Sequence, residues 1–392
     1  MSAQRSSLVL VMDGDFVRNG SHPASRRFGY SQFLFRYADV FEDVRVLARV
    51  KEEDDPKAER ADGPRVAMLP LTYTRDIGLF LRQLAKVAGL ARKIGPEEAV
   101  ILRVPGFFPL VFGVMLILRR TPYAVEVMAD PALTYSKNSY NVRGRVLLKL
   151  VMVALTKLVC RKAHWSSYVT RRALQDDYPP APGAPTTDYT TLNLPRAFVR
   201  PEPRERADAW TLRLVQVGVM QKHIKGQDIM IRAVALLKQA GVPCTLDFVG
   251  DGENRGVFEA MAAEYGVADR VAFGGFASWG DELVARLDAA DVFVLPSRQE
   301  GLPRALIEAS ARGLVCYASD LPGNRELAED AFIVSPNTPE AWAQALTRAH
   351  ALTGEAYRER SAASLAVAER YVADVVHPRR LAFYRAVAGA EA

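Results

Sequence analysis

The sequence is poor in the residues that build metal sites and disulfide frameworks. Its 392 residues include three cysteines and five histidines, and none of them forms a C-x-x-C motif or a His/Cys cluster. Cys160, Cys244 and Cys316 each sit in an apolar stretch, which is typical of buried thiols in a reducing compartment. This pattern argues against structural zinc and against a disulfide-stapled secreted domain.

Long apolar runs are missing as well. The first segment, MSAQRSSLVLVMDGD, turns acidic after a run too short for the core of a signal peptide or for a bilayer span. We therefore expect a cytoplasmic protein. Hydrophobic residues make up 49% and charged residues 24% of the chain, which favours ordinary folded domains, and the length favours two of them.

Acidic residues are absent from one long stretch. The net charge is +6, yet no Asp or Glu occurs from Pro131 to Gln175. The helix expected over 143–162 carries basic residues at multiples of four, namely Arg145, Lys149, Lys157 and Arg161. Two interpretations stay open: a core helix with one charged edge in water, and peripheral contact with an anionic membrane at the inner face of the plasma membrane.

Short apolar segments alternate with periodic helical ones through both halves of the chain. Apolar strands separated by helices indicate parallel sheets covered on both faces. The proline-rich segment from Pro179 to Arg206 predicts a linker near its end. We predict an α/β protein of two doubly wound, Rossmann-like domains, 1–200 and 205–374, facing each other across a cleft. The helix 375–392 is expected to pack back on the first domain.

The segment SRQEGLPRALIEAS places two glutamates around a glycine and a proline. Pro303 suits the first helical position, so Glu300 lies in the preceding loop and Glu308 inside the helix. The helix start offers unpaired N–H groups to a diphosphate, and Gly301 allows close approach. A wholly helical offset would separate the glutamates by about 12 Å, beyond the roughly 5 to 10 Å of a glycosidase pair. The pattern favours two carboxylates that bind separate hydroxyls of one extended ligand, such as a nucleotide sugar.

The stretch EGLPRALIE resembles the E-x7-E motif of retaining nucleotide-sugar glycosyltransferases of family 4, which have the GT-B fold. The resemblance continues, in the family's order, through VGVMQKHIKGQDIMIRAVALL, FVGDGENR, DRVAFGGF and SDLPGNREL. It implies transfer of a sugar, with retention, from a UDP- or GDP-sugar to a hydroxyl of a glycan or polyprenyl-linked glycan. It also implies bacterial surface polysaccharide or glycoconjugate biosynthesis as the context, and neither metal nor other cofactor.

The resemblance further implies roles for particular residues. Lys225 would neutralise the departing diphosphate, Glu300 would contact the transferred sugar, and Glu308 would bind the ribose hydroxyls. Further donor contacts are expected at Gly218, Val219, Gly250, Phe276, Gly301, Leu302, Pro303 and Arg304. Acceptor contacts are expected at Arg103 and Asp130.

The chain departs from the family pattern at two positions. Val219 stands where an arginine often follows the first strand of the donor domain, and Ala129 replaces the histidine of a His-Asp pair in the acceptor site. Either Lys225 and the helix start suffice for catalysis, or another residue supplies the second positive charge. The candidates for that charge are Lys222, His223 and Arg304.

Other functions fit the sequence less well. The DGD at 13–15 mimics the D-x-D metal motif of the GT-A fold, but it follows the first strand, where polar turns are common. In VGDGENRG the third glycine, Gly256, comes one position late for a dinucleotide fingerprint. Nucleic-acid binding lacks interleaved aromatic residues. A nucleotide-sugar epimerase of the same fold, and a nucleotide-sugar-binding protein without turnover, remain as alternatives.

Overall fold

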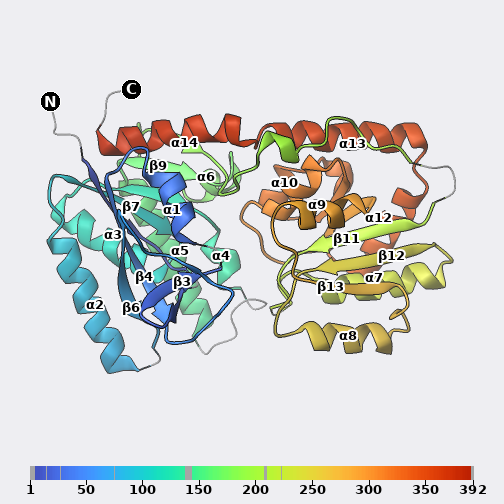
Figure 1. Ribbon diagram of the computed structural model, residues 1–392, viewed down its shortest axis with the longest axis horizontal. Coiled ribbons are helices and arrows are strands. Elements are labelled where there is room, and N and C mark those ends of the chain that lie inside the picture. Colours follow the sequence, from blue (N-terminus) through green and yellow to red (C-terminus); the bar gives the residue numbers. More distant parts are fainter. Residues whose placement is uncertain are drawn as a thin grey trace. The chain divides into compact units, whose positions relative to one another are not determined.

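The structure is a computed structural model that describes residues 5–14, 16–26, 28–74, 76–136, 144–206, 210–221 and 223–389. The chain divides into two compact units (Figure 1). Unit 1 comprises Met1–Ala132, Val146–Tyr189 and His377–Ala392, and unit 2 comprises Leu133–Arg145 and Thr190–Val376.

Unit 1 is built on a mostly parallel sheet of order β10-β9-β8-β7-β1-β4-β2-β3-β5, with β6 paired to β4. Its strands are β1 (Ser7–Val11), β2 (Phe16–Asn19), β3 (His22–Ser25), β4 (Asp43–Lys51), β5 (Glu59–Arg60), β6 (Val66–Thr72), β7 (Glu98–Val104), β8 (Ala124–Val127), β9 (Trp165–Tyr168) and β10 (Thr186–Asp188). Only the pairings β2 with β3 and β3 with β5 are antiparallel within the described residues. The helices in or bordering this unit are α1 (Tyr30–Tyr37), α2 (Ile77–Arg92), α3 (Phe107–Arg119), α4 (Pro131–Thr134), α5 (Arg145–Lys162), α6 (Ala173–Asp177) and α14 (Ala373–Ala388).

The central strands of unit 1 explain why its sheet is covered on both faces. Residues 8–11 of β1 and 99–104 of β7 are buried at every position, so neither strand presents a face to water. Such strands need helices on both sides, as the unbroken apolar runs predicted. The C-terminal helix α14 is tied into this unit, because Tyr384 donates to the buried Glu126 Oε1 over 2.9 Å and Arg379 pairs with Asp188 at 3.2 Å.

Unit 2 is a doubly wound parallel domain of strand order β13-β12-β11-β14-β15-β16. Its strands are β11 (Leu212–Val217), β12 (Cys244–Val249), β13 (Val271–Gly275), β14 (Val292–Leu295), β15 (Val315–Ser319) and β16 (Ile333–Val334). Its helices are α7 (Gln227–Gln239), α8 (Arg255–Glu264), α9 (Asp281–Asp288), α10 (Arg304–Ala311), α11 (Pro322–Arg325), α12 (Pro339–His350) and α13 (Gly354–Glu369).

Two apolar cores cover the faces of the unit 2 sheet. One contains side chains of α7, α8 and α12, and the other contains side chains of α9, α10 and the end of α13. Figure 1 shows α7 and α8 on one side of β11, β12 and β13, with α9 and α10 on the other. The three cysteines are buried and free, as predicted, and burial raises the pKa of Cys160 to about 12.

The division between the units falls earlier in the chain than the predicted linker. It lies between Tyr189 and Thr190, not near 200–205, because the segment that follows packs on unit 2. Leu194 and Phe198 are buried in the core formed with α9 and α10, and Arg200 N donates to Ala311 O over 2.8 Å. Proline content marks the loss of regular structure but does not reveal which core the segment joins.

Candidate functional site

The candidate site lies at the carboxyl edge of the unit 2 sheet, where the chain order reverses between β11 and β14. The two strands are adjacent and parallel, and the sheet grows from them in opposite directions. Ligands of open α/β sheets bind at such a switch point. Gly218 and Val219 follow β11, and the loop from Pro296 to Pro303 follows β14. The two loops therefore meet where a ligand is expected.

An ion pair joins these loops. Lys225 Nζ lies 2.6 Å from Glu300 Oε1, and Ser297 Oγ donates to the same oxygen over 2.6 Å. The Glu300 side chain is 8% exposed and that of Lys225 22% exposed. Sequence reasoning proposed roles for Lys225 and Glu300 separately, and the structure brings them into direct contact. It also adds Ser297, which the spacing of the two glutamates did not single out.

A second set of bonds holds the loops in register. Arg298 N donates to Ile224 O over 2.8 Å, and the Arg298 guanidinium binds both carboxylate oxygens of Asp228, at 2.8 and 2.7 Å. Burial raises the pKa of Asp228, but the bonds from Arg298 outweigh that effect and hold it below its ordinary value. Gln216 Nε2 donates to Lys225 O over 2.6 Å, which fixes the backbone of the lysine.

Two glycines allow the backbones of this edge to approach one another. Gly226 has φ +73°, and a Cβ there would lie 2.1 Å from Pro296 O. Gly250 has φ +145°, and a Cβ there would lie 2.1 Å from Gly218 O. Any other residue would push these loops apart, since left-handed φ values and such contacts are open only to glycine. The position of Lys225 thus depends on its neighbour Gly226.

Helix α10 supplies the second glutamate. Pro303 is its N-cap, at φ −73° and ψ 110°, and Arg304 is the first helical residue, one position later than predicted. Glu308 is 8% exposed, and burial raises its pKa, an effect partly offset by the Arg304 charge and by a hydrogen bond from Trp279. The site therefore keeps a carboxyl group largely out of water near the start of a helix.

Two aromatic side chains follow β13 in the same unit. Phe276, predicted as a donor contact, is 65% exposed, and Trp279 is half exposed. Trp279 stacks on Phe198 with ring centres 5.5 Å apart and also bonds Glu308. Sequence reasoning missed Trp279, although a tryptophan in a glycine-rich loop at the end of a strand was the available signal.

The candidates for a second positive charge differ in their surroundings. Lys222 lies outside the described residues. His223 is half exposed, and its Nδ1 is 3.6 Å from Asp228 Oδ1. Arg304 is exposed in the first turn of α10, and its charge offsets part of the rise that burial causes in the pKa of Glu308.

The two predicted acceptor residues lie in unit 1 and already have partners. Arg103 is buried, with Nε 2.9 Å from Glu126 Oε2, and its guanidinium lies over the Phe28 ring. Asp130 accepts a bond from Ala132 N at 2.7 Å and another from the Tyr178 hydroxyl. Their acceptor roles stay predictions.

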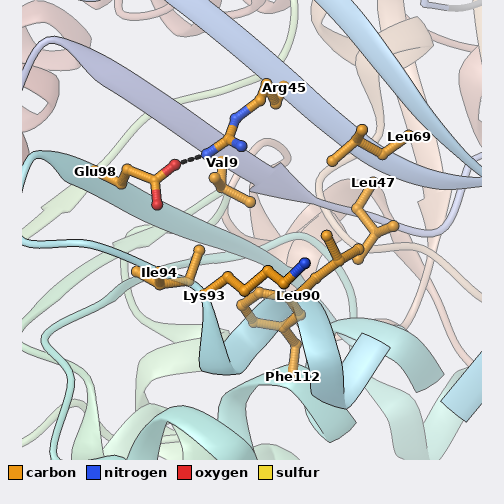
Figure 2. A pocket seen from close by; sticks show the side chains of 9 residues that line it. All are labelled: Val9, Arg45, Leu47, Leu69, Leu90, Lys93, Ile94, Glu98 and Phe112. Atoms are coloured by element: carbon orange, nitrogen blue, oxygen red, sulfur yellow. Dashed lines mark ion pairs between the residues drawn. The ribbon is translucent and has the colours of Figure 1, made fainter. Parts of the chain in front are cut away.

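The described part of the DGD segment is already hydrogen-bonded. Asp13 accepts bonds from Phe107 N and from Arg49, and Asp15 lies outside the described residues. Within the described ranges, no group of three or more His, Cys, Asp or Glu residues could hold a metal ion. Figure 2 shows a cavity of unit 1 near the start of β7, crossed by the Arg45–Glu98 ion pair and lined mainly by apolar side chains.

The sequence of the chain is similar to those of known glycosyltransferases and related bacterial proteins. Residues 204–363 match the family model described as Glycosyl transferases group 1. Protein CapJ of Staphylococcus aureus is 24% identical over 335 residues, which are 84% of this chain and 83% of CapJ. The amylovoran biosynthesis glycosyltransferase AmsK of Erwinia amylovora is 33% identical over 165 residues, 40% of each chain.

Solved structures give the fold of the whole chain. Anabaena HepE in complex with UDP and glucose matches with a TM-score of 0.64 at 15% identity, covering 99% of both chains. A sucrose-phosphate synthase from Thermosynechococcus elongatus matches with a TM-score of 0.68 at 17% identity, covering 99% of this chain and all of the other. The predicted GT-B fold is confirmed, and the family match and the relatives support a glycosyltransferase.

Proposed function

We propose that this protein is a retaining glycosyltransferase that moves a sugar from a UDP- or GDP-sugar to a hydroxyl of a glycan or lipid-linked glycan. The observation that carries the proposal is the Lys225–Glu300 pair beside the start of α10, at the switch point of a domain that matches the group 1 family. AmsK is named for amylovoran biosynthesis, and HepE was solved with UDP and glucose, which supports a polysaccharide context and a nucleotide-sugar donor.

The donor extends along the edge of the unit 2 sheet. Its diphosphate lies against the start of α10. There the backbone N–H groups of Gly301, Leu302 and Arg304 donate to it, and the helix dipole adds a partial charge of about +0.5. Glu308 accepts hydrogen bonds from the ribose hydroxyls. The exposed Phe276 and the backbone around Gly218, Val219 and Gly250 complete the donor contacts.

Lys225 and Glu300 act on the reacting end of the donor. Both bonds to Glu300 go to Oε1, which leaves Oε2 to accept a hydrogen bond from a sugar hydroxyl. As the bond to the sugar breaks, the departing diphosphate gains negative charge, and Lys225 stabilises that charge together with the helix start. A cation placed in advance where charge develops is worth several kcal/mol, about a hundredfold or more in rate.

The reaction needs no metal or other cofactor in this proposal, because lysine and the helix dipole supply the positive charge. The acceptor hydroxyl attacks the face from which the diphosphate leaves, so the anomeric configuration is retained. The acceptor is bound by unit 1, through Asp130 and Arg103 or residues near them. We propose a bacterial surface glycan as the product, made at the cytoplasmic side with peripheral contact to the membrane.

The test begins with the donor. A panel of UDP- and GDP-sugars is screened for a rise in the melting temperature, since a ligand that binds only the folded state stabilises it. Transfer is then assayed with glycan acceptors in the presence of a chelator, and the anomeric configuration of the product is determined by NMR.

Matched lysine variants check the assigned role. Lys225→Met is expected to abolish most turnover, whereas Lys238→Met, which removes an exposed lysine paired to Asp269, should leave it unchanged. Conversion of the donor without any acceptor would instead indicate an epimerase. Tight donor binding with no turnover on any acceptor would indicate a binding protein.

A further inference from the structure

Helix α5 exposes apolar side chains to water. Four of them, Val146, Leu147, Leu150 and Val151, are 62%, 67%, 61% and 44% exposed. One of the two interpretations placed the basic stripe on the edge of the helix in water, and in the first half of the helix Arg145 and Lys149 are less exposed than these apolar side chains. A spacing of four residues advances by 400°, so the stripe drifts by about 40° per step around the helix.

The drift separates the helix face into two parts. Arg145 and Lys149 are only partly exposed, while Lys157, Arg161 and Lys162 are exposed in the last turns. On a helical projection the exposed apolar residues and these three cations share one face. Its first half is therefore apolar and its last two turns are cationic, with no acidic residue from Pro131 to Gln175 to offset them.

We propose that this face docks unit 1 on a bilayer that contains anionic phospholipid. The four apolar side chains enter the boundary between headgroups and acyl chains, and Lys157, Arg161 and Lys162 contact the phosphates. Among the described residues no helix is long and apolar enough to cross a membrane, so the contact is peripheral.

The charge pattern selects a membrane over a second copy of the chain. A twofold dimer would bury the same patch on both subunits. The cations of one copy would then lie against those of the other, or would be buried without a partner. A bilayer with anionic headgroups can contact the cations with its phosphates and the apolar side chains with its acyl chains at the same time.

The docking face is related to the acceptor site by the topology of unit 1. Helix α5 connects β8 to the parallel strand β9, so it starts at the carboxyl edge of the sheet and runs back toward the other edge. Asp130 follows β8 at that same edge. The apolar half of the face thus lies toward the edge where the proposed acceptor binds, which suits a glycan carried on a lipid. This last step rests on the proposed function, but docking itself does not.

Vesicle co-sedimentation tests the docking with no donor or acceptor present, so its outcome is independent of transferase activity. The full-length protein is mixed with neutral phosphatidylcholine vesicles and with vesicles containing about 30% phosphatidylglycerol. We expect binding to the anionic vesicles only, weakened by salt because exposed charges are screened. The variant L147E/L150E should lose at least about 100-fold in partitioning, since each buried leucine contributes tenfold or more.

Matched variants separate docking from damage to the fold. Val257→Glu adds a charge at an equally exposed apolar position on α8 of unit 2 and should bind as the wild type does. K157Q/R161Q should bind anionic vesicles at least tenfold more weakly. Melting curves should be unchanged, because all of these side chains are exposed.

Three results would overturn the inference. The first is equal sedimentation of the wild type with neutral and anionic vesicles, or none with either. The second is wild-type binding by L147E/L150E. The third is a dimer in solution that L147E/L150E dissociates, which would assign the face to a second copy of the chain.

Discussion

Removing Lys225 should affect stability and catalysis through separate causes. The change Lys225→Met leaves Glu300, which is 8% exposed, with the Ser297 hydroxyl as its remaining side-chain partner among the residues that the structure describes. A charge-assisted hydrogen bond of 2.6 Å contributes about 1.5 to 3 kcal/mol. For a domain of this size 1 kcal/mol corresponds to roughly 2 to 4 °C, so the melting temperature should fall by about 3 to 12 °C. If Lys225 contributes the same free energy to binding the departing diphosphate in the transition state, its removal should lower turnover by about 10- to 150-fold.

A double-mutant cycle separates these effects. Glu300→Gln removes the buried charge, so adding it to Lys225→Met should restore stability. Glu300→Gln in the wild-type background should instead lower stability. Turnover should respond differently, because in the proposed function the two side chains contact different parts of the donor. The double variant should therefore be slower than either single one. Stability is measured by thermal and urea unfolding, and turnover with the donor found in the screen. A coupling free energy of unfolding below about 0.3 kcal/mol would refute an interaction between Lys225 and Glu300, since the effects of mutations at distant sites are additive within that limit.

Three further changes have definite expected outcomes. Burial raises the pKa of Glu308, so the stability that this side chain contributes is greatest below the ordinary glutamate pKa and is lost as pH rises through its pKa in the folded protein. Glu308→Gln should therefore raise the melting temperature more at pH 7 than at pH 4. Donor binding, measured by calorimetry, should weaken about 10- to 100-fold in this variant. Gly226→Ala should cost more stability and turnover than Gly241→Ala, because both have φ near +70° but only the first Cβ meets a backbone carbonyl; equal urea midpoints would contradict this. Tyr384→Phe should cost about 1 kcal/mol in urea unfolding, since it removes a buried bond to Glu126, and an unchanged midpoint would show that this bond does not contribute to holding α14.

The order of the elements in unit 2 could be predicted because many of its apolar runs end at a glycine or proline. Gly241 and Gly313 follow α7 and α10 with positive φ, and Gly226 precedes α7. The contact between Lys225 and Glu300 could not be predicted in the same way. It depends on Arg298 binding Asp228 and on the close approach at Gly226, which join loops that are far apart in the sequence.

For helix α5, the sequence did not predict which face is exposed to water. Its basic residues at multiples of four suggested a charged edge in water, but that spacing exceeds one helical turn, so the stripe winds around the helix. Burial of Met152, Thr156 and Val159 against unit 1 then decides which face remains exposed. Sequence periodicity gives the helix, and only the packing partner gives its orientation.

The candidate site sets its cations opposite carboxylates. Lys225 pairs with Glu300, Arg298 binds Asp228, and the charge of Arg304 offsets part of the rise that burial causes in the pKa of Glu308. These contacts stabilise buried acidic groups that the proposed donor requires, since an unpaired charge out of water is costly. A diphosphate that enters the site would compete with Glu300 for Lys225 and with Glu308 for Arg304. The positive charge that the family resemblance led us to expect at the position of Val219 would then come from Lys225 or Arg304, which also stabilise the carboxylates of the site.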